Sequence, residues 1–460
     1  VRDRIRGSYA LGIIHEEQPD KIICTRKESP LIIGLGKDKN FIASDVPAIL
    51  KYTRDVIFLE NDEIAVIEEG KVTVFDKEGK PIEKEVTKIE WDMEQASKNG
   101  YPHFMLKEIE EQPAVVERTL EVYIKRDGKV DFGKAFEKID FEKIKEIDII
   151  ACGTAYHAGL QAAYFFKKMA KIKTNVDIAS EFRYSDPFLS EDNLVIFISQ
   201  SGETLDTLMA LKLARSKGAK TLAITNVVGS TISREADVVL YTVAGPEISV
   251  ASTKAYTTQV VTFYLLALYV AFKCNRVTLE EYESYLDKIY SLSEKIGKMF
   301  FNKEKIEKIA QEVKDRKNGF YIGRGIDEKI TREGSLKMKE ITYIHTEAFP
   351  AGELKHGPIA LIEEGTMIVV VSTQRDMVEK VASNIKELKA RGAFVISVTK
   401  ADYKEILDVS DRVILIDDID DMVAPLLSMI PLQLLSYYTA VAKGLDVDKP
   451  RNLAKSVTVE

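Results

Sequence analysis

The stretch LVIFISQSGETLDT, residues 194–207, determines the fold that the sequence predicts. Its opening run of valine, isoleucine and other apolar residues is typical of a strand buried within a parallel sheet. The run leads into the polar hexapeptide SQSGET, residues 199–204, and then into the helical pattern of residues 208–219. The stretch therefore predicts a buried strand, a glycine-containing turn and a helix.

The same arrangement recurs in the second half of the chain. TMIVVVSTQRDMVEK, residues 366–380, matches the stretch above, so Ser199 and Ser372 are predicted to end equivalent strands. Three further segments are duplicated, with helical segments between them: residues 147–159 match 318–330, residues 219–227 match 392–400, and residues 237–242 match 411–416. The repeat predicts an α/β fold with two doubly wound parallel sheets and right-handed crossovers.

The SQSGET turn is a candidate anion-binding site. Ser199, Ser201 and Thr204 supply hydroxyl groups, and Gly202 leaves backbone N–H groups accessible. The helix that follows adds the partial positive charge of its N-terminus, so the turn can hold a phosphate without a lysine. An ordinary N-cap needs one hydroxyl, whereas this turn has three, which favours a substrate that carries a phosphate group.

Composition excludes several classes of function. With 460 residues, 45 % of them apolar and 30 % charged, the chain is expected to form several domains. Its net charge of −8 argues against nucleic acid or a membrane as the main partner. No apolar run is long enough to span a bilayer, and the best candidate, residues 260–272, is predicted to form a buried helix. The three cysteines are too few and too scattered for a disulfide framework, which predicts a location in the reducing cytoplasm. The five histidines are not paired at metal-ligand spacing, so we expect no metal site. Gly323-Arg324-Gly325 starts like a dinucleotide fingerprint, but Glu328 stands where the third glycine belongs, so we expect no cofactor.

The first 90 residues follow a different pattern. Short apolar segments punctuated by glycine and aspartate predict a β-rich unit, with strands in residues 8–16, 21–27, 30–36, 40–45, 56–62, 63–70 and 71–76. Residues 91–134 are polar, helical in places and broken by Gly100, Pro102 and Pro113. They are predicted to connect this unit to the repeated domains.

Two features of the second half are candidates for chemistry. Glu333, Lys337 and Glu340 fall on one face of a predicted helix, although that pattern alone is typical of a solvated ion-pair ladder. The turn at residues 349–358 is rich in glycine and proline around His356. A rigid turn that holds a single imidazole favours a functional histidine.

Four of these motifs together resemble one enzyme family. SQSGETLDT, EISVASTKAYTTQ, EGSLKMKEITYIHTEAFPAGELKHGP and the terminal KPRNLAKSVTVE are similar to glutamine:fructose-6-phosphate aminotransferases, or glucosamine-6-phosphate synthases, and the two repeated domains resemble SIS (sugar isomerase) domains. The resemblance implies a partial glutaminase domain of the N-terminal-nucleophile type at 1–92, a first SIS domain with its linker at 93–276, a second at 277–444, and a tail that closes the active site at 445–460.

The resemblance also implies a reaction. The family makes glucosamine 6-phosphate from fructose 6-phosphate and ammonia released from glutamine, as a homodimer or a larger oligomer. Its catalytic N-terminal cysteine is expected upstream of Val1, because the first cysteine here, Cys24, lies inside a predicted strand. We therefore expect the chain as given to use free ammonia, or to isomerise fructose 6-phosphate, without using glutamine.

The site residues that the resemblance implies fall within the quoted motifs. The groups implied to hold the sugar phosphate are Thr154, Ser199, Gln200, Ser201 and Thr204, and those implied to contact the sugar are Val250 and Ser252. The implied catalytic groups are Glu340 as the base between C1 and C2, Lys337 assisting it, His356 for ring opening from the neighbouring subunit, and Lys455 forming an imine with the substrate. Ala155 stands where the family has a serine, which affects one expected contact with a substrate hydroxyl.

The chemistry of amination requires the same residue types. A lysine imine makes C2 more electrophilic and the C1 hydrogen more acidic, and a partly desolvated carboxylate is a suitable base for moving that proton. Apolar residues on both sides of Lys455 predict a docked tail instead of a frayed one.

Two alternative functions use only part of the set formed by the phosphate turn and the catalytic residues. A phosphosugar isomerase needs the phosphate turn and Glu340 but not Lys455, and a non-enzymatic SIS sensor of sugar phosphates needs none of the catalytic groups.

Overall fold

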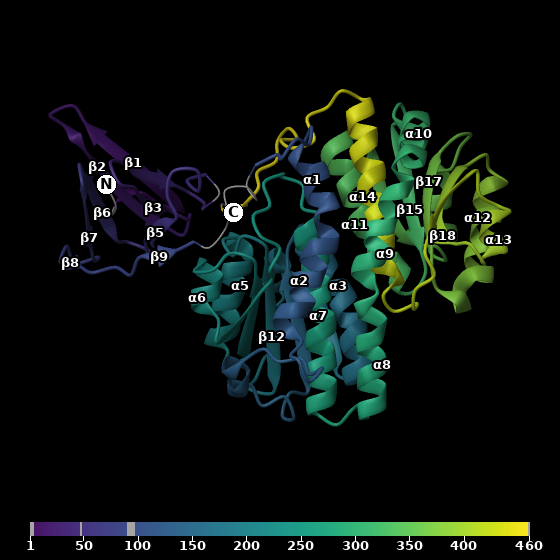
Figure 1. Cartoon of the computed structure of the whole chain (residues 1–460), viewed down its shortest axis with the longest axis horizontal. Helices are drawn as coiled ribbons and strands as arrows, with labels where there is room; N and C mark the ends of the chain where they lie inside the picture. The colour runs from purple at the N-terminus through teal and green to yellow at the C-terminus, as the bar shows by residue number, and fades with distance from the viewer. Residues whose placement is uncertain (1–3, 47, 90–96, 459–460) are drawn as a thin grey trace.

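A computed structural model describes residues 4–46, 48–89 and 97–458 of the chain. Figure 1 shows a β-rich unit at the N-terminus and two α/β domains that lie on either side of a layer of long helices. The boundary predicted between residues 92 and 93 lies outside the described residues. Both predicted parallel sheets are present, which confirms the predicted fold class.

The N-terminal unit contains two antiparallel sheets, with strand orders β1-β2-β6-β7-β8 and β4-β3-β5-β9. All seven predicted segments form strands, and the bounds are β1 (Tyr9–His15), β2 (Gln18–Lys27), β3 (Ile32–Leu35), β4 (Asn40–Ala43), β5 (Asp55–Phe58), β6 (Ile64–Glu68), β7 (Lys71–Phe75), β8 (Pro81–Ile82) and β9 (Thr87–Lys88). Buried side chains from both sheets, among them Cys24 and Ile33, pack in one cluster. The two sheets therefore share a small core of their own.

The first α/β domain has a parallel sheet in the order β11-β10-β12-β13-β14. Its strands are β10 (Glu146–Ala151), β11 (Lys173–Ile178), β12 (Asn193–Ser199), β13 (Lys220–Thr225) and β14 (Val238–Tyr241). The connecting helices are α3 (Gly153–Phe165), α4 (Ala179–Phe182), α5 (Leu205–Ser216) and α6 (Thr231–Glu235). Every residue of β12 is buried, as expected for a central strand covered by helices on both faces.

The second domain repeats this topology in the order β16-β15-β17-β18-β19. Its elements are β15 (Asn318–Gly323), α11 (Ile326–Thr342), β16 (His345–Pro350), β17 (Met367–Ser372), α12 (Val378–Lys389), β18 (Phe394–Lys400), α13 (Lys404–Leu407) and β19 (Arg412–Ile416). Ser199 ends β12 and Ser372 ends β17, which confirms the predicted equivalence. The edge strands β11 and β16 were not predicted, because exposed and half-buried polar residues interrupt their apolar pattern.

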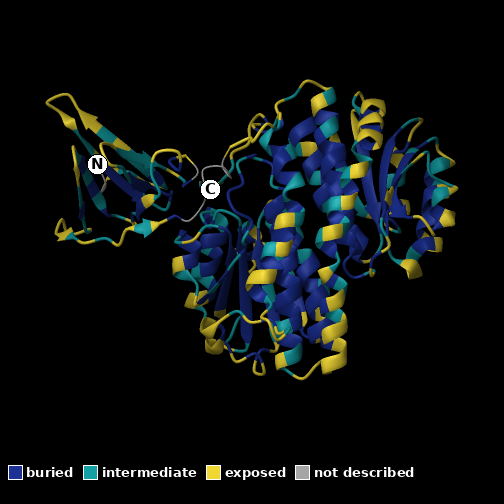
Figure 2. Ribbon diagram, in the orientation of Figure 1, coloured by how far each residue is buried: buried dark blue, intermediate teal, exposed yellow. Residues whose placement is uncertain are grey.

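Helices from both halves form one layer between the sheets (Figures 1 and 2). Besides α3 and α11, which pack against each other, the layer contains α1 (Phe104–Glu110), α2 (Gln112–Tyr123), α7 (Lys254–Lys273), α8 (Leu279–Tyr290), α9 (Leu292–Met299), α10 (Lys303–Val313) and α14 (Ala424–Ala442). One cluster of buried apolar side chains contains residues of both sheets and of these helices. The two domains therefore share a continuous core, and a site between them has rigid walls.

Residues 97–134 are more than the predicted connection. Their helices α1 and α2 contribute buried side chains such as Met105, Ile109 and Val116 to the shared core. Several of their polar residues are buried in pairs, for example Gln112 against Gln433 at 2.6 Å. The segment was predicted to be a linker because its composition is polar. The partners that bury these polar residues lie far away in the sequence, so the composition does not reveal them.

Two helices of the layer are strongly apolar. α7 and α14 have the length and hydropathy of membrane-spanning helices, and 89 % of the apolar window in each is buried inside the protein. Such burial is typical of the core helices of a folded domain. It confirms the prediction that the apolar run at residues 260–272 forms a buried helix.

Candidate active site

The SQSGET turn lies between the carboxyl end of β12 and the N-terminus of α5, where sheets of this topology bind ligands. Its hydroxyl groups form one network. Ser199 Oγ accepts the N–H of Gly202 (3.0 Å) and lies 2.8 Å from Thr204 Oγ1. Ser201 Oγ accepts the N–H of Glu203 (3.1 Å). The turn therefore orients three hydroxyls at the positive end of a helix, as an anion site requires.

Gly202 is required for this turn. Its φ is +68°, and a Cβ at this position would lie 2.0 Å from Ser230 Oγ. The next residue, Glu203, accepts hydrogen bonds from the N–H and the hydroxyl of Thr231, each at 2.7 Å. Burial raises the pKa of Glu203, and these bonds together with the charge of Arg26 from the N-terminal unit offset only part of that effect. The one carboxylate in the turn is therefore engaged by its neighbours.

The C-terminal tail crosses the turn. The N–H of Leu205, the first residue of α5, donates to the carbonyl of Val457 (3.2 Å). Slightly earlier in the tail, Lys455 Nζ lies 2.6 Å from Glu247 Oε2 and 2.8 Å from the carbonyl oxygen of Ser249. The side chain of Lys455 is 18 % exposed and that of Glu247 is fully buried. The tail therefore fixes an amine beside the SQSGET turn.

Glu247 is a site residue that the sequence analysis missed. Besides Lys455 it accepts hydrogen bonds from Ser252 Oγ (3.0 Å) and from the N–H groups of Thr253 (2.9 Å) and Ala255 (3.0 Å). Burial raises the pKa of Glu247, but the charge of Lys455 and these donors outweigh burial and hold the pKa below its ordinary value. An acidic residue shortly before a helix was the available signal, because such residues satisfy N–H groups of the first turn.

The face of α11 that carries Glu333, Lys337 and Glu340 is largely buried, so the alternative of a solvated ion-pair ladder is wrong. The Lys337 side chain is 1 % exposed, and its Nζ lies 2.5 Å from Glu340 Oε2 and 3.4 Å from Glu333 Oε1. Burial opposes the charge on Lys337, but the two carboxylates outweigh it and hold the pKa of Lys337 well above its ordinary value. The lysine is therefore a fixed cation beside the carboxylate of Glu340.

Thr154 connects this cluster to the first domain. Its hydroxyl donates to Glu333 Oε1 (2.9 Å) and accepts from Lys337 Nζ (3.0 Å). On the same helix, α3, His157 Nδ1 lies 2.7 Å from Glu333 Oε2. The structure thus places Thr154 among the charged groups of α11, and a contact between Thr154 and phosphate stays a prediction. The neighbouring Ala155 is partly buried against the shared core.

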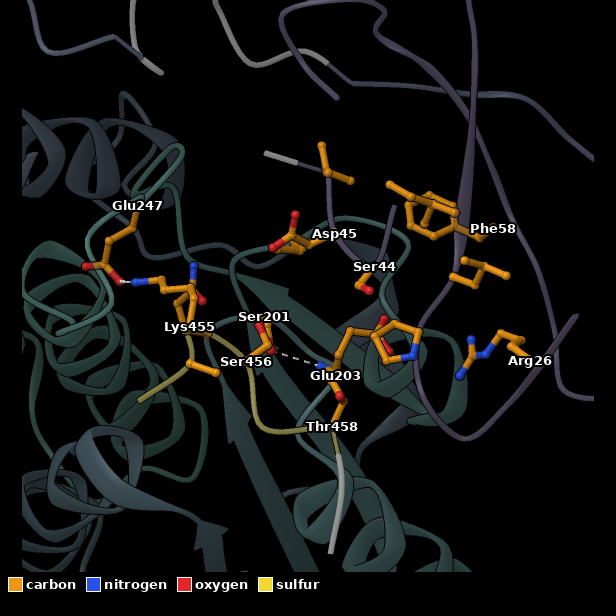
Figure 3. A pocket seen from close by; sticks show the side chains of 17 residues that line it. Arg26, Ser44, Asp45, Phe58, Ser201, Glu203, Glu247, Lys455, Ser456 and Thr458 are labelled. Atoms are coloured by element: carbon orange, nitrogen blue, oxygen red, sulfur yellow. Dashed lines mark hydrogen bonds and ion pairs between the residues drawn. The ribbon is translucent and has the colours of Figure 1, made fainter. Parts of the chain in front are cut away.

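A cavity of about 280 Å³ lies where the first α/β domain, the tail and the N-terminal unit meet (Figure 3). Gln200, Ser201 and Lys455 contribute to its wall. Figure 3 shows Asp45 and Phe58 of the N-terminal unit on the other side of this space. The predicted phosphate turn and the predicted imine-forming lysine therefore border one cavity.

Of the predicted site residues, Gln200, Ser201 and Lys455 line this cavity, and the others do not: Thr154, Ser199, Thr204, Val250, Ser252, Lys337, Glu340 and His356. The N–H of Val250 donates to the carbonyl of Asp448 in the tail (3.0 Å), so its loop is tied to the tail. His356 ends a short helical turn, Leu354–His356, in the second domain, and its side chain is exposed. Within the described residues this chain does not bring His356 into contact with Lys455 or with Lys337.

The equivalent turn of the second domain is filled by its own chain. Asp327, in the first turn of α11, accepts hydrogen bonds from the N–H (2.7 Å) and the hydroxyl (2.6 Å) of Thr373, the residue after Ser372. Burial raises the pKa of Asp327 to about 6 in spite of these bonds. A carboxylate of the protein thus occupies this turn, whereas the hydroxyls of the first turn bond to one another and to backbone N–H groups, so the repeat is asymmetric at this point.

The two duplicated parallel sheets define the class of the protein. The family model for the SIS domain matches residues 140–269 and 312–443, one match in each α/β domain. A relative from Fusobacterium nucleatum subsp. nucleatum, named glutamine–fructose-6-phosphate aminotransferase (isomerizing), is 58 % identical over 460 residues, which are 100 % of this chain and 76 % of that protein. A relative of the same name from Caldanaerobacter subterraneus subsp. tengcongensis is 54 % identical over 461 residues, which again cover 100 % of this chain and 76 % of that protein. The chain belongs to the glutamine–fructose-6-phosphate aminotransferase (isomerizing) family.

A solved structure agrees with this assignment. The C-terminal domain of glucosamine-fructose-6-phosphate aminotransferase from Francisella tularensis matches with a TM-score of 0.74 and 41 % sequence identity, covering 77 % of this chain and 100 % of that one. The family resemblance that the four sequence motifs predicted is therefore confirmed.

Proposed function

We propose that this protein converts fructose 6-phosphate and ammonia, supplied by glutamine in the full reaction, to glucosamine 6-phosphate. The names of its relatives support this reaction. The observation that carries the proposal is the position of Lys455, whose ammonium group is held by Glu247 and Ser249 on the wall of the cavity that Ser201 also lines. A phosphate on the turn directs the carbon chain of the sugar towards this amine.

Binding rests on the SQSGET turn. In the proposal the phosphate accepts hydrogen bonds from the hydroxyls of Ser199, Ser201 and Thr204, with Gln200 and Thr154 as further contacts. The loop before α7 contacts the sugar through Val250 and Ser252. Charge-assisted hydrogen bonds to phosphate are stronger than neutral ones, so three hydroxyls at a helix N-terminus can hold the phosphate.

Covalent chemistry rests on Lys455. Its ammonium group loses one proton to become the nucleophilic amine and attacks the C2 carbonyl of the open-chain sugar. The carbinolamine then expels the former carbonyl oxygen as water. In total, one ammonium group and one ketone give one protonated imine and one water molecule. Glu247 balances the positive charge before and after this step, since it lies 2.6 Å from Lys455 Nζ.

Amination and proton transfer complete the reaction. Ammonia attacks C2 of the imine and displaces Lys455 as a free amine, which leaves an imine of ammonia on the sugar. Glu340 then removes a proton from C1 and returns one to C2, while the proton of the C1 hydroxyl passes to the new amine, so that C1 becomes an aldehyde. The buried Lys337 ammonium, 2.5 Å from Glu340, keeps this base in place.

Assembly follows from His356. Because this side chain is exposed and outside the cavity of its own chain, we propose that it promotes ring opening in the site of a neighbouring subunit, within a homodimer or a larger oligomer. The three cysteines, Cys24, Cys152 and Cys274, are all free thiols, which supports a reducing, cytoplasmic location.

Borohydride trapping tests the proposal. Incubation with fructose 6-phosphate and sodium borohydride is expected to reduce the imine and attach the sugar to Lys455, as peptide mass spectrometry would show. Lys455→Arg keeps the charge but stays protonated, so it is expected to bind the sugar phosphate and to lose amination with ammonium chloride by several orders of magnitude. Isomerisation without a trapped adduct would favour a phosphosugar isomerase, and binding without either reaction would favour a sensor.

A further inference from the structure

Glu108 is a buried carboxyl outside the groups described so far. It lies on α1 and is 2 % exposed. Its Oε1 accepts the N–H of Ile248 and, at 3.3 Å, the N–H of Ser249. The carbonyl oxygen of that same Ser249 accepts the ammonium of Lys455 at 2.8 Å. One peptide segment therefore separates Glu108 from the amine, with a hydrogen bond on each side.

A second set of hydrogen bonds connects the same three segments, which are helix α1, the loop at residues 247–250 and the C-terminal tail. The carboxylate of Asp448, at the start of the tail, accepts the N–H groups of Phe104 (3.0 Å) and Met105 (2.9 Å) at the start of α1. Its carbonyl oxygen accepts the N–H of Val250 (3.0 Å). Helix α1, the loop at residues 247–250 and the tail thus form a closed set of contacts, and Ser249 within it accepts the ammonium of Lys455.

We infer that Glu108 is a positioning residue for the amine of Lys455, because it holds the N–H of Ser249, the residue whose carbonyl oxygen accepts that amine. This inference rests on the proposed function, in which Lys455 attacks C2. An attacking amine must stay within a few tenths of an ångström of its productive position, and a displacement of about 1 Å costs on the order of 100-fold in rate.

The carboxyl group itself supports a role beyond packing. Within the described residues Glu108 Oε2 has no hydrogen-bond partner, so burying this oxygen costs free energy that an apolar side chain would avoid. Burial and the nearby charge of Glu247 raise the pKa of Glu108 to about 8. The group is therefore mainly a neutral acid at pH 7, and the part of it that the loop uses is the single acceptor oxygen Oε1.

Three variants test the inference in the full chain. Glu108→Ala removes the acceptor, Glu108→Gln keeps an acceptor oxygen without a titratable proton, and Glu110→Ala is the matched control on the same helix, because Glu110 pairs with Lys303 (2.8 Å) away from the loop. The rate of borohydride trapping on Lys455 with saturating fructose 6-phosphate is measured together with the Kd of that sugar by calorimetry.

The expected pattern separates positioning from binding. Glu108→Ala is expected to slow trapping by at least about tenfold while the Kd changes by less than about twofold, since the phosphate turn is untouched. Glu108→Gln is expected to restore trapping to within about threefold of the wild type, and Glu110→Ala to match it. If Glu108→Ala does not fold, Glu108→Asp, which is too short to reach both N–H groups, takes its place with the same expected loss.

Two failures are distinguishable. A wild-type protein that is not trapped on Lys455 contradicts the proposed function. A trapped wild type with equally fast trapping in Glu108→Ala, or with Glu108→Gln as slow as Glu108→Ala, overturns the positioning role alone. A loss of affinity as large as the loss of trapping rate would also overturn it, because it would show general damage to the site.

Discussion

The N–H of Leu205 and the carbonyl oxygen of Val457 are hydrogen-bonded at 3.2 Å. Leu205 is the first residue of α5, so this bond uses one of the donors that the helix offers to an anion. The tail therefore competes directly for the positive end of α5. A phosphate on the turn must rely on the hydroxyls of Ser199, Ser201 and Thr204 and on the remaining N–H groups.

Removal of two of these hydroxyls should weaken sugar-phosphate binding. Ser201→Ala combined with Thr204→Ala is expected to reduce the binding free energy of fructose 6-phosphate by about 2–4 kcal/mol, at about 1–2 kcal/mol for each charge-assisted hydrogen bond. Isothermal titration calorimetry measures the change. Ser216→Ala at the exposed far end of α5 is the control, and an unchanged Kd in the double variant would remove the phosphate assignment.

Replacing Lys337 by Met should destabilise the fold in a pH-dependent way. Burial raises the pKa of Glu333, but Lys337, His157 and Thr154 outweigh burial and hold it below the ordinary value, so Glu333 stabilises the protein above the unfolded pKa and loses that effect as pH falls. Without Lys337 its buried charge is poorly compensated. We expect a loss of about 3–5 kcal/mol at pH 7.5.

The penalty of Lys337→Met should shrink towards pH 5, where Glu333 can take up a proton. Urea unfolding at the two pH values measures it, and Lys339→Met on the exposed side of α11 is the control. An equal loss at both pH values would show that packing, and not charge, accounts for the effect.

The Glu108 carboxyl should make stability fall with rising pH. Burial raises its folded-state pKa from the usual 4.5 to about 8, with Glu247, Lys455 and Lys254 as the charged neighbours. Its contribution is therefore fully present below about 4.5 and is lost as pH rises to about 8. Glu108→Gln does not titrate, so its stability relative to the wild type is expected to increase across this window and to level off above it. Thermal unfolding of both proteins from pH 5 to pH 9 would show a constant difference if Glu108 does not titrate there.

Sites shared between subunits should allow complementation. Lys455→Ala and His356→Ala are each expected to be inactive alone. After mixed refolding, half of the dimers carry one of each variant, and one of the two sites in such a dimer contains both intact residues, so about a quarter of the wild-type activity should return. Activity with ammonium chloride is the measurement. No recovery, with mixed dimers confirmed by native mass spectrometry, would place His356 in its own chain's site or outside the reaction.

Local patterns predicted the parts of the site that depend on local sequence. The strand, turn and helix around Ser199 follow from apolar runs and turn chemistry, and the duplicated order of strands follows from the repeat. These features are determined by residues that are close in the chain. The role of Lys455 was implied by the family resemblance. The docked tail was predicted from its apolar residues, but Leu453 and Val457 are exposed, and the tail is held instead by Lys455 and by the carbonyl of Val457.

The missed features depend on distant partners. Glu247 and Lys455 are 208 positions apart, and neither sequence context indicates the other. Helix α11 was misjudged for the same reason. The spacing of Glu333, Lys337 and Glu340 fits a solvated helix face as well as a buried one, and the contact with Thr154 of the other domain is not visible in that spacing. Burial of charge is a property of the assembled domains, so periodicity alone does not predict it.

Asp327 in the second domain shows how the two copies of the repeat have come to differ. Its carboxylate closes the turn after β17, whereas α11 of the same domain carries the charged groups that meet Thr154 of the first domain. The second domain therefore contacts the first through a helix face and satisfies its own turn internally. A substitution of Asp327 would act within its own domain, whereas a substitution of Glu333 would act on both domains at once.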